Sequence, residues 1–399
     1  MKTDCGRRTV NLKEVDDTAP HGPEHNVQEA NSFLTAEKTN IRTPLSAMRV
    51  LVVTNMYPSP EQPAFGTFVK NQVDDLRAAD VAIDVLMING RKNRWNYLWG
   101  VFRFWKQLLA NRYDLIHCHY IFSGLIGRLQ WRYPVILTHH GVEVVYDGWV
   151  SKLVRFTHRW FDKVIVVSQA QEDVLQDPKV ALVPCGIDFD KMRLMPQHEA
   201  RGILKLPLDQ KLVLWAGEFW QPVKRYYLVE KAMALVQEQV PEAKLIRVSG
   251  QPHSMMPYYM NACDVLVLTS SYEGSPMVIK EAMACNLPIV STAAGDVAQV
   301  IEGTEGCSLC ESTPEDVARK LMAVLSWGKR TCGRQRIRHL DSRVIARRVA
   351  NLYEELCPTE DTRLSRLRKE KRGQGRPRGF RSRRTLVPLD DTRGRKETS

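Results

Sequence analysis

Hydrophobic residues from Met48 onwards occur in short runs separated by amphipathic segments. The run MRVLVVTN at 48–55 is apolar until its polar end, which is typical of a buried strand in a parallel sheet. The segment VKNQVDDLRAA at 69–79 follows a Pro-rich loop and predicts a helix. The alternation continues to residue 187. It predicts further strands at 81–88, 113–120, 134–141, 162–168 and 179–187, and helices at 96–110, 123–131, 153–161 and 171–176.

The pattern restarts after the segment 189–200, which we interpret as a linker. Strands that alternate with helices at this spacing form parallel sheets, so the expected fold class is α/β, with two Rossmann-like, doubly wound domains facing a cleft. The second half predicts strands, some with their following loops, at 210–219, 243–250, 265–271 and 288–295, and helices at 226–240, 258–264, 276–285, 296–301 and 314–327.

These elements set the expected domain boundaries. We expect a flexible extension at 1–47, a first Rossmann-like domain at 48–192, a second at 193–357 and a basic, disordered tail at 358–399. The helix at 341–356 is a candidate to pack back on the first domain. No strand is followed by GxGxxG, which disfavours a dinucleotide cofactor.

Positive charge is concentrated in the tail. Residues 360–399 hold 14 Lys and Arg and 6 Asp and Glu, a net charge of +8, whereas the whole chain carries +12. Such a tail is compatible with binding to nucleic acid or to an anionic membrane. It is equally compatible with a solvated segment that has no specific role.

The cysteines and apolar runs indicate the compartment. The nine cysteines are scattered and odd in number, which indicates free thiols in a reducing cytosol. We interpret the lone CxxC at 307–310 as a turn rather than a metal or redox site. No segment resembles a secretion signal, and no run approaches the ~20 apolar residues of a membrane span. We therefore expect a cytoplasmic protein, either soluble or peripheral at the inner face of the plasma membrane.

Two glutamates, Glu273 and Glu281, flank a predicted helix start. Ser275 is a suitable N-cap and Pro276 suits the first helical position. The free N–H groups and partial positive charge at this helix end suit a phosphate. A diphosphate there would leave Glu273 for the hydroxyls of a sugar and Glu281 for those of a ribose, as in a nucleotide-sugar. The alternative is structural, with Glu281 in a helical salt bridge and Glu273 as a loop charge.

The chain resembles the retaining glycosyltransferases of family 4 (group 1), which have the GT-B fold and an E-x7-E stretch. The resemblance spans roughly residues 48–356, and its combination of motifs is similar to bacterial enzymes that build teichuronic or colanic acid. The segments that carry it are NMYPSP (55–60), FGTFV (65–69), DLIHCH (114–119), THHG (138–141), VPCGID (183–188), PVKR (222–225), MNACD (260–264) and EGSP to KEAMAC (273–285).

This resemblance implies a hexosyltransferase that moves a sugar from a nucleotide-diphospho-sugar to a glycan or lipid-linked acceptor, with retention and without a metal or other cofactor. Glu273 would bind the donor sugar and Glu281 the ribose. Lys224 would stabilise the departing diphosphate. His140 would lie beside the reacting sugar, with His139 as the alternative. The other residues implied to bind the donor are Gly66, Thr67, Glu218, Ser249, Gly250, Gly274, Ser275, Pro276 and Met277.

Two features depart from the family pattern. An arginine normally occurs six residues before the lysine that corresponds to Lys224, and this chain has Glu218 there. Arg225 or Arg247 are the candidates to compensate for the missing cation. In addition, only residues 251–261 separate Gly250 from the ACD motif, where many relatives carry an extra strand and helix that contact the base. The base of the donor therefore stays open.

Other functions fit parts of the pattern. Asp188-Phe189-Asp190 resembles the DxD of metal-dependent transferases, but it follows a complete Rossmann-like half. A glycoside hydrolase also uses two carboxylates, yet Glu281 inside a helix does not suit one. A non-catalytic binder of nucleotide-sugars or nucleic acid is favoured by Glu218 and by the basic tail, with nucleic acid the less expected partner.

Aromatic and basic residues alternate at 91–106, as they do in helices that lie at a membrane surface. The interpretation that we prefer from sequence is that this helix covers the sheet.

Overall fold

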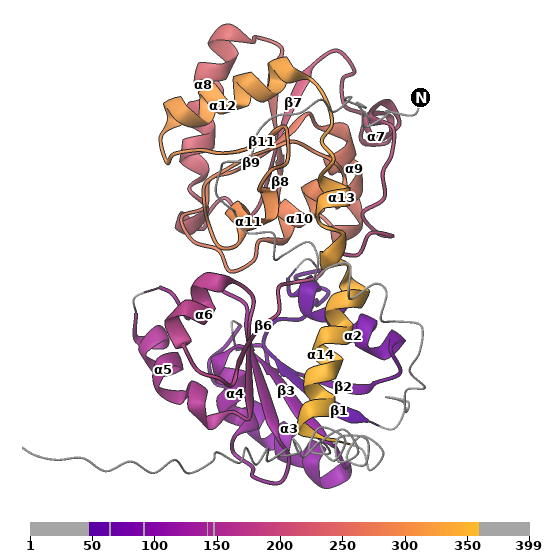
Figure 1. The fold of residues 1–399 in the computed structure, drawn as a ribbon, viewed down its shortest axis with the longest axis vertical. Coiled ribbons are helices and arrows are strands. Elements are labelled where there is room, and N and C mark those ends of the chain that lie inside the picture. Colours follow the sequence, from indigo (N-terminus) through magenta and orange to yellow (C-terminus); the bar gives the residue numbers. More distant parts are fainter. Residues whose placement is uncertain (1–47, 64, 91, 142, 147, 359–399) are drawn as a thin grey trace, which may run out of the picture. The chain divides into compact units, whose positions relative to one another are not determined.

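The computed structural model describes residues 48–358, apart from residues 64, 91, 142 and 147. Within this part the chain forms two parallel β-sheets, each with helices on both faces (Figure 1). The predicted α/β class is therefore confirmed. The predicted flexible extension and basic tail lie outside the described residues.

The first sheet has six parallel strands in the order β2-β1-β3-β4-β5-β6. Its central strands are nearly continuous in apolar residues because helices cover both of their faces, and Leu51, Val52 and Val53 of β1 are fully buried. The strands are β1 (Arg49–Thr54), β2 (Ala82–Met87), β3 (Leu115–His119), β4 (Val135–His139), β5 (Lys163–Val166) and β6 (Val180–Leu182).

Helices α3 to α6 lie on one face of this sheet, where Phe104 of α3 and Ile121 of α4 share an apolar core with Leu51. Helix α2 lies on the other face, where its Val73 shares a core with Val52. The helices of the first half are α2 (Thr67–Ala78), α3 (Asn96–Ala110), α4 (Ile121–Gly127), α5 (Trp149–Thr157) with a 3-10 turn at His158–Trp160, and α6 (Gln169–Leu175).

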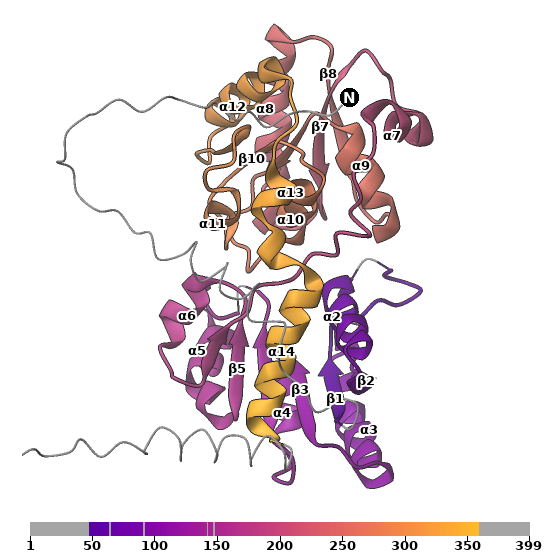
Figure 2. The ribbon, with the colours of Figure 1, turned by 45° about the vertical axis from the view of Figure 1, so that its right-hand side comes forward.

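The last described helix, α14 (Ser342–Leu356), lies beside α2 on the first sheet (Figures 1 and 2). The hydroxyl of its Tyr353 is 2.6 Å from Nδ1 of His117, and Nε2 of His117 is 2.7 Å from Oγ1 of Thr138. All three side chains are buried. A satisfied polar connection in the core therefore joins the end of the described chain to the first sheet.

The second sheet has five parallel strands in the order β11-β10-β9-β7-β8. Trp215 of β7 shares a core with α8 and α12 on one face, and Leu214 shares a core with α9 and α10 on the other. The strands are β7 (Lys211–Ala216), β8 (Ala243–Val248), β9 (Val265–Leu268), β10 (Ile289–Ser291) and β11 (Cys307–Leu309). The helices are α7 (Gln197–Leu204), α8 (Tyr226–Gln239), α9 (Met256–Ala262), α10 (Met277–Ala284), α11 (Val297–Ile301), α12 (Pro314–Trp327) and α13 (Gly333–Arg336), with 3-10 turns at Pro222–Lys224, His253–Met255 and Arg338–Leu340.

Two elements differ from the prediction. The segment interpreted as a linker contains the start of α7, whose buried Arg201 pairs with Asp264 at 2.9 Å and also donates to backbone carbonyls. The CxxC segment is not a turn, because Cys307–Leu309 pairs with β10 as the edge strand β11. Cys307 and Cys310 are free thiols.

Helix α3 covers the first sheet with a narrow stripe only. Its buried residues are Gly100 and Phe104, whereas Trp99 and Phe102 are 68% and 69% exposed. The interpretation that the helix covers the sheet is confirmed by Phe104 in the core and by Tyr97, Val101 and Leu108 packed against it, but it does not account for the exposed aromatic residues on the outer side. None of the helices described between residues 48 and 358 has both the length and the apolar character needed to cross a bilayer.

Candidate functional site

The loop between β9 and α10 passes between two other backbone segments. A Cβ on Gly274 would lie 2.1 Å from the carbonyl oxygen of His140, which belongs to the first half of the chain. A Cβ on Gly295, whose φ is +64°, would lie 2.4 Å from the carbonyl oxygen of Gly274. Only glycine fits at both positions. Gly274, predicted to bind the donor through its N–H, therefore also has a packing role.

The start of α10 differs by one residue from the prediction. Pro276 is the N-cap and Met277 is the first helical residue. Ser275 is not the cap, because its hydroxyl donates to Oδ2 of Asp296 at 2.6 Å and accepts from Lys280. The backbone N–H of Ile279 donates to the carbonyl of Pro276 at 3.2 Å, whereas those of Met277 and Val278 have no acceptor within the helix, as at any helix N-terminus.

Lys280 is a fully buried lysine in α10 that was not among the predicted site residues. Its Nζ is 3.0 Å from Oδ2 of Asp296 and donates to the carbonyl of Cys185 at 3.1 Å. Lys280 thereby ties the loop before α10 to the segment that ends the first half. Its position beside Glu281 in a mainly apolar helix was the only signal in the sequence.

Glu273 and Lys224 come together across the loop. Nζ of Lys224, in the 3-10 turn after β7, is 2.6 Å from Oε1 of Glu273. The two side chains are 21% and 15% exposed, so both charges keep some access to solvent. The structure thus joins the residue predicted to bind the diphosphate to the residue predicted to bind the sugar.

Glu281, the second predicted carboxylate, pairs with a histidine that was not among the predicted site residues. Nε2 of His253 is 2.7 Å from Oε1 of Glu281, whose side chain is 4% exposed. Burial alone would lower the pKa of His253, but the hydrogen bond and charge of Glu281 outweigh it and raise that pKa. An isolated histidine in a Pro-rich loop gives no sequence signal for such a pairing.

Glu218 and the two arginines that could compensate for the missing cation have different partners in the structure. Oε2 of Glu218 accepts a hydrogen bond of 3.1 Å from the hydroxyl of Ser249 at the end of β8. Arg225 donates to the carbonyls of Thr269 and Ser270. The guanidinium of Arg247 stacks 5.0 Å from the ring centre of Phe219. Neither arginine pairs with Glu218 among the described contacts.

Three predicted donor-binding positions are loop or terminal residues. Gly66 has φ of +74° and directly precedes Thr67, the first residue of α2. A Cβ on Gly66 would lie 2.3 Å from the carbonyl carbon of Met56, so packing within the first half already requires glycine. Gly250 has φ of +67° and open space where a Cβ would lie.

His140 lies at the end of β4 and is partly exposed, whereas His139 is fully buried. Nε2 of His140 is 2.8 Å from Nδ1 of His119, and the ring of Phe68 lies 4.7 Å from the His140 ring. Burial lowers the pKa of His140 to about 4, so the ring is neutral near pH 7. Of the two histidines, only His140 is thus accessible for contact with a substrate.

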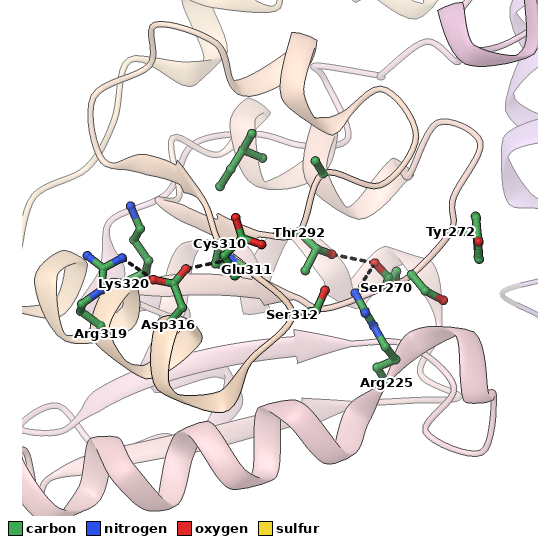
Figure 3. A pocket seen from close by; sticks show the side chains of 13 residues that line it. Arg225, Ser270, Tyr272, Thr292, Cys310, Glu311, Ser312, Asp316, Arg319 and Lys320 are labelled. Carbon is green, nitrogen blue, oxygen red and sulfur yellow. Dashed lines mark hydrogen bonds and ion pairs between the residues drawn. The ribbon is translucent and has the colours of Figure 1, made fainter.

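Two cavities lie near these residues. One, of about 600 Å³, is lined by residues from both halves of the chain, among them Thr67, Lys70 and His253. The other, of about 640 Å³, lies at the carboxyl ends of β9, β10 and β11, with Arg225 and charged residues of α12 in its wall (Figure 3). The first cavity contacts Thr67 and the partner of Glu281, so we take it as the candidate nucleotide cleft.

Asp188 and Asp190 are both engaged in contacts with other residues of the chain. Asp188 accepts from two backbone N–H groups and is 3.0 Å from Nζ of Lys191, and Asp190 pairs with Arg343. Within residues 48–358, as far as they are described, no group of three or more His, Cys, Asp or Glu side chains is arranged to hold a metal ion.

Comparison with protein families matches both halves of the chain. Residues 46–191 match the family described as Glycosyltransferase Family 4, and residues 246–326 match Glycosyl transferases group 1. The chain therefore belongs to this class of glycosyltransferases.

Related proteins are consistent with that membership. The D-inositol 3-phosphate glycosyltransferases of Mycobacterium bovis and Mycobacterium tuberculosis are 26% identical to it over 46% of the chain. The match covers 48% of their sequences, so the chain spans about half the length of the curated relatives it matches.

Solved structures share the fold. Sucrose-phosphate synthase from Thermosynechococcus elongatus has a TM-score of 0.64 at 20% identity, covering 77% of this chain and 99% of that one. Anabaena Alr3699/HepE, solved with UDP and glucose, has a TM-score of 0.61 at 16% identity, covering 77% and 100%. The predicted GT-B fold is therefore confirmed. The finer similarity to teichuronic- or colanic-acid enzymes stays a prediction.

Proposed function

We propose that the protein transfers a hexosyl group from a nucleotide-diphospho-sugar to a glycan acceptor. One arrangement carries the proposal: Glu273 and Glu281 lie before and within α10, and each is held by a basic side chain, Lys224 or His253. The helix N-terminus between them suits a diphosphate, and the carboxylates suit the hydroxyls of sugar and ribose.

Uridine diphosphate is the nucleotide to test first. Anabaena Alr3699/HepE, which shares the fold, was solved with UDP and glucose. In the present chain His253 lines the candidate nucleotide cleft and fixes one oxygen of Glu281, which leaves the other oxygen for a ribose hydroxyl. These observations support a UDP-sugar as donor.

The transfer requires no protein nucleophile. The acceptor oxygen bonds to the anomeric carbon while the bond from that carbon to the diphosphate oxygen breaks, and the acceptor proton moves to the departing phosphate oxygen. Reaction on one face retains the anomeric configuration. Lys224 and the N-terminus of α10 supply positive charge to the leaving group, as a divalent ion does in metal-dependent transferases. The protein otherwise positions the reactants.

His140 acts in this scheme as a neutral hydrogen-bonding side chain beside the sugar. Its lowered pKa keeps it uncharged near pH 7, and its contact with His119 fixes the ring. The acceptor, which by resemblance is a lipid-linked polysaccharide of the cell envelope, would enter from the first half of the chain. A cytoplasmic site at the inner face of the membrane follows from that acceptor.

The test is release of UDP from a panel of UDP-sugars, measured with and without lipid-linked glycan acceptors. We expect at least one UDP-sugar to be turned over, and Lys224→Met to lower the rate about a hundredfold because leaving-group stabilisation is lost. Lys231→Met, an exposed lysine on α8, is the matched control. Equal rates in the two variants would contradict the role of Lys224.

A non-catalytic binder is the second candidate, and Glu218 favours it because an anion there opposes charge stabilisation of a diphosphate. A binder would bind UDP and UDP-sugars tightly but release no UDP from any of them. Substitution of Glu218 by arginine would then strengthen UDP binding without producing turnover.

A further inference from the structure

We propose that the outer surface of helices α3, α4 and α5 docks on an anionic lipid bilayer. This inference deepens the proposed function, because it names the surface that brings the enzyme to a lipid-linked acceptor, and it stands on separate observations. We call this surface the aromatic face. Its large exposed residues are Trp95, Leu98, Trp99, Phe102, Trp105, Leu109, Leu129, Trp131, Trp149, Phe156 and Trp160.

The three helices lie on one side of the first sheet. Their buried residues Phe104, Ile126 and Val154 belong to the same apolar core. Ring contacts link the helices in sequence, since Tyr97 of α3 lies 5.5 Å from Phe122 of α4, and Phe122 lies 5.8 Å from Trp149 of α5. The three helices are therefore neighbours on this side of the sheet, and the exposed residues come from α3 and the residue before it, from Leu129 and Trp131 after α4, and from α5 with the 3-10 turn that follows it.

The exposure of this face is unusual for residues of this type. Trp131 is 90% exposed, Phe156 is 71% exposed and Trp149 is 67% exposed. Six of the nine tryptophans of the chain belong to this face. Aromatic side chains cost free energy when they face water, and contiguous apolar patches on soluble domains mark binding surfaces.

The charge of the aromatic face identifies its partner. The segments 96–112, 121–134 and 149–161 contain eight Lys and Arg residues and no Asp or Glu. Arg128 pairs with Asp162, and the other seven cations are exposed, although Arg159 also lies 3.6 Å from a carboxylate oxygen of Asp177. The eight are Arg103, Lys106, Arg112, Arg128, Arg132, Lys152, Arg155 and Arg159.

An anionic bilayer satisfies both properties at once. Its interface accepts tryptophan and phenylalanine side chains, and its negative surface attracts lysine and arginine within about a Debye length. A second copy of the chain would instead place two positively charged faces against each other. The combination of exposed aromatics and exposed cations thus favours a bilayer over self-association.

The experiment is co-sedimentation of the full chain with vesicles of phosphatidylcholine containing phosphatidylglycerol, and with vesicles of phosphatidylcholine alone. The test variant is Trp99→Ser with Phe102→Ser. The control is Ile203→Ser with Leu208→Ser, which removes two exposed apolar residues from the second half. We expect the test variant to bind anionic vesicles at least about tenfold more weakly than the wild type. The control variant should bind them as tightly as the wild type does.

Charge is tested by Lys106→Glu with Lys152→Glu, compared with Lys231→Glu and Lys244→Glu on the second half. Only the first pair is expected to weaken binding. A repeat near 1 M salt, where the Debye length is about 3 Å, suppresses the electrostatic contribution of the basic tail and leaves insertion of the aromatic face. Quenching of tryptophan fluorescence by brominated lipid should accompany that binding.

Three results would overturn the proposal: absence of vesicle binding by the wild type, equal binding by the test and control variants, or a dimer that dissociates when Trp99 and Phe102 are replaced. Affinity for UDP, measured without vesicles, should be unchanged in all of these variants. A failure of the bilayer proposal is thus distinguishable from a failure of the proposed function.

Discussion

Nζ of Lys224 lies 2.6 Å from Oε1 of Glu273, so the residues proposed to bind diphosphate and sugar neutralise each other in the structure. A bound donor would contact both side chains, its diphosphate lying at Lys224 and its sugar at Glu273. The ion pair therefore couples binding of the diphosphate to binding of the sugar. Removal of the Glu273 carboxylate should strengthen binding of the diphosphate and weaken binding of the sugar.

The first prediction concerns Glu273→Gln. Lys224 loses its counter-ion in this variant and becomes free for the diphosphate, so UDP should bind about threefold to tenfold more tightly. The preference for a UDP-sugar over UDP should disappear, because the carboxylate no longer binds sugar hydroxyls. Isothermal titration calorimetry with both ligands measures the two effects. Glu230→Gln, on the exposed side of α8, is the control and should change neither.

The pair of His253 and Glu281 predicts a dependence of stability on pH. The folded state raises the pKa of His253, so this histidine adds stability that is fully present below its ordinary pKa of about 6.5. That contribution is lost as the pH rises through the raised value. The difference in free energy of unfolding between wild type and His253→Gln should therefore be larger at pH 6 than at pH 9.

Urea unfolding at both pH values gives this difference, with His198→Gln, an exposed histidine of α7, as the control. A His253 difference that is the same at both values would show that Glu281 does not hold the proton on the ring.

His117 of β3 and His140 after β4 predict the opposite dependence. Burial lowers the pKa of His140 to about 4 and that of His117 to about 3. Between about pH 6.5 and those values the unfolded chain binds protons that the folded chain excludes, so stability falls as the pH falls. Each such histidine contributes a slope approaching about 1.4 kcal/mol per pH unit.

His140→Gln should reduce the slope of unfolding free energy against pH between pH 6.5 and 4.5. A variant slope as steep as that of the wild type would mean that His140 is already protonated in the folded state.

The contact between Tyr353 and His117 predicts how firmly α14 is attached. Tyr353→Phe leaves Nδ1 of a fully buried histidine without its partner, which should lower the free energy of unfolding by about 1–3 kcal/mol. Tyr227→Phe removes a hydroxyl from a tyrosine that is 53% exposed and should cost almost nothing. Denaturant unfolding of both variants measures the difference, and equal values would rule out a stabilising role for this contact.

Lys280 gives the largest expected loss of stability. Lys280→Met leaves the carboxylate of Asp296 without its cation in the core, and breaking a buried ion pair from one side costs about 3–5 kcal/mol. Addition of Asp296→Asn should recover part of that loss, because the unpaired charge is then removed. If the double variant is less stable than Lys280→Met alone, the ion pair is not the source of the effect.

The sequence predicts the two sheets because buried parallel strands must be apolar on both faces. It fails at β11, a three-residue edge strand whose Cys307 and Ser308 carry no β pattern. It fails also at α7, where a largely polar segment conceals Arg201, a buried cation that satisfies several carbonyls. Short or polar elements depend on tertiary contacts that local patterns do not contain.

In the functional site, too, local features were predictable from the sequence and tertiary contacts were not. Glu273 and Glu281 are predictable because their spacing and the following helix are local features. His253 is not, since it reaches Glu281 through the fold from 28 residues away. The N-cap prediction for Ser275 is wrong because Asp296, in a different loop, competes for the same hydroxyl.

The most direct test of the central claim compares the affinity of UDP with that of 2′-deoxy-UDP and 3′-deoxy-UDP, in the wild type and in Glu281→Gln. If Glu281 binds the ribose, the wild type should prefer UDP to at least one deoxy analogue by about tenfold, since a hydrogen bond to a charged group contributes about 1.5–3 kcal/mol. The folded variant should bind all three with similar affinity. A preference that is the same in both proteins, or absent from both, would contradict the account.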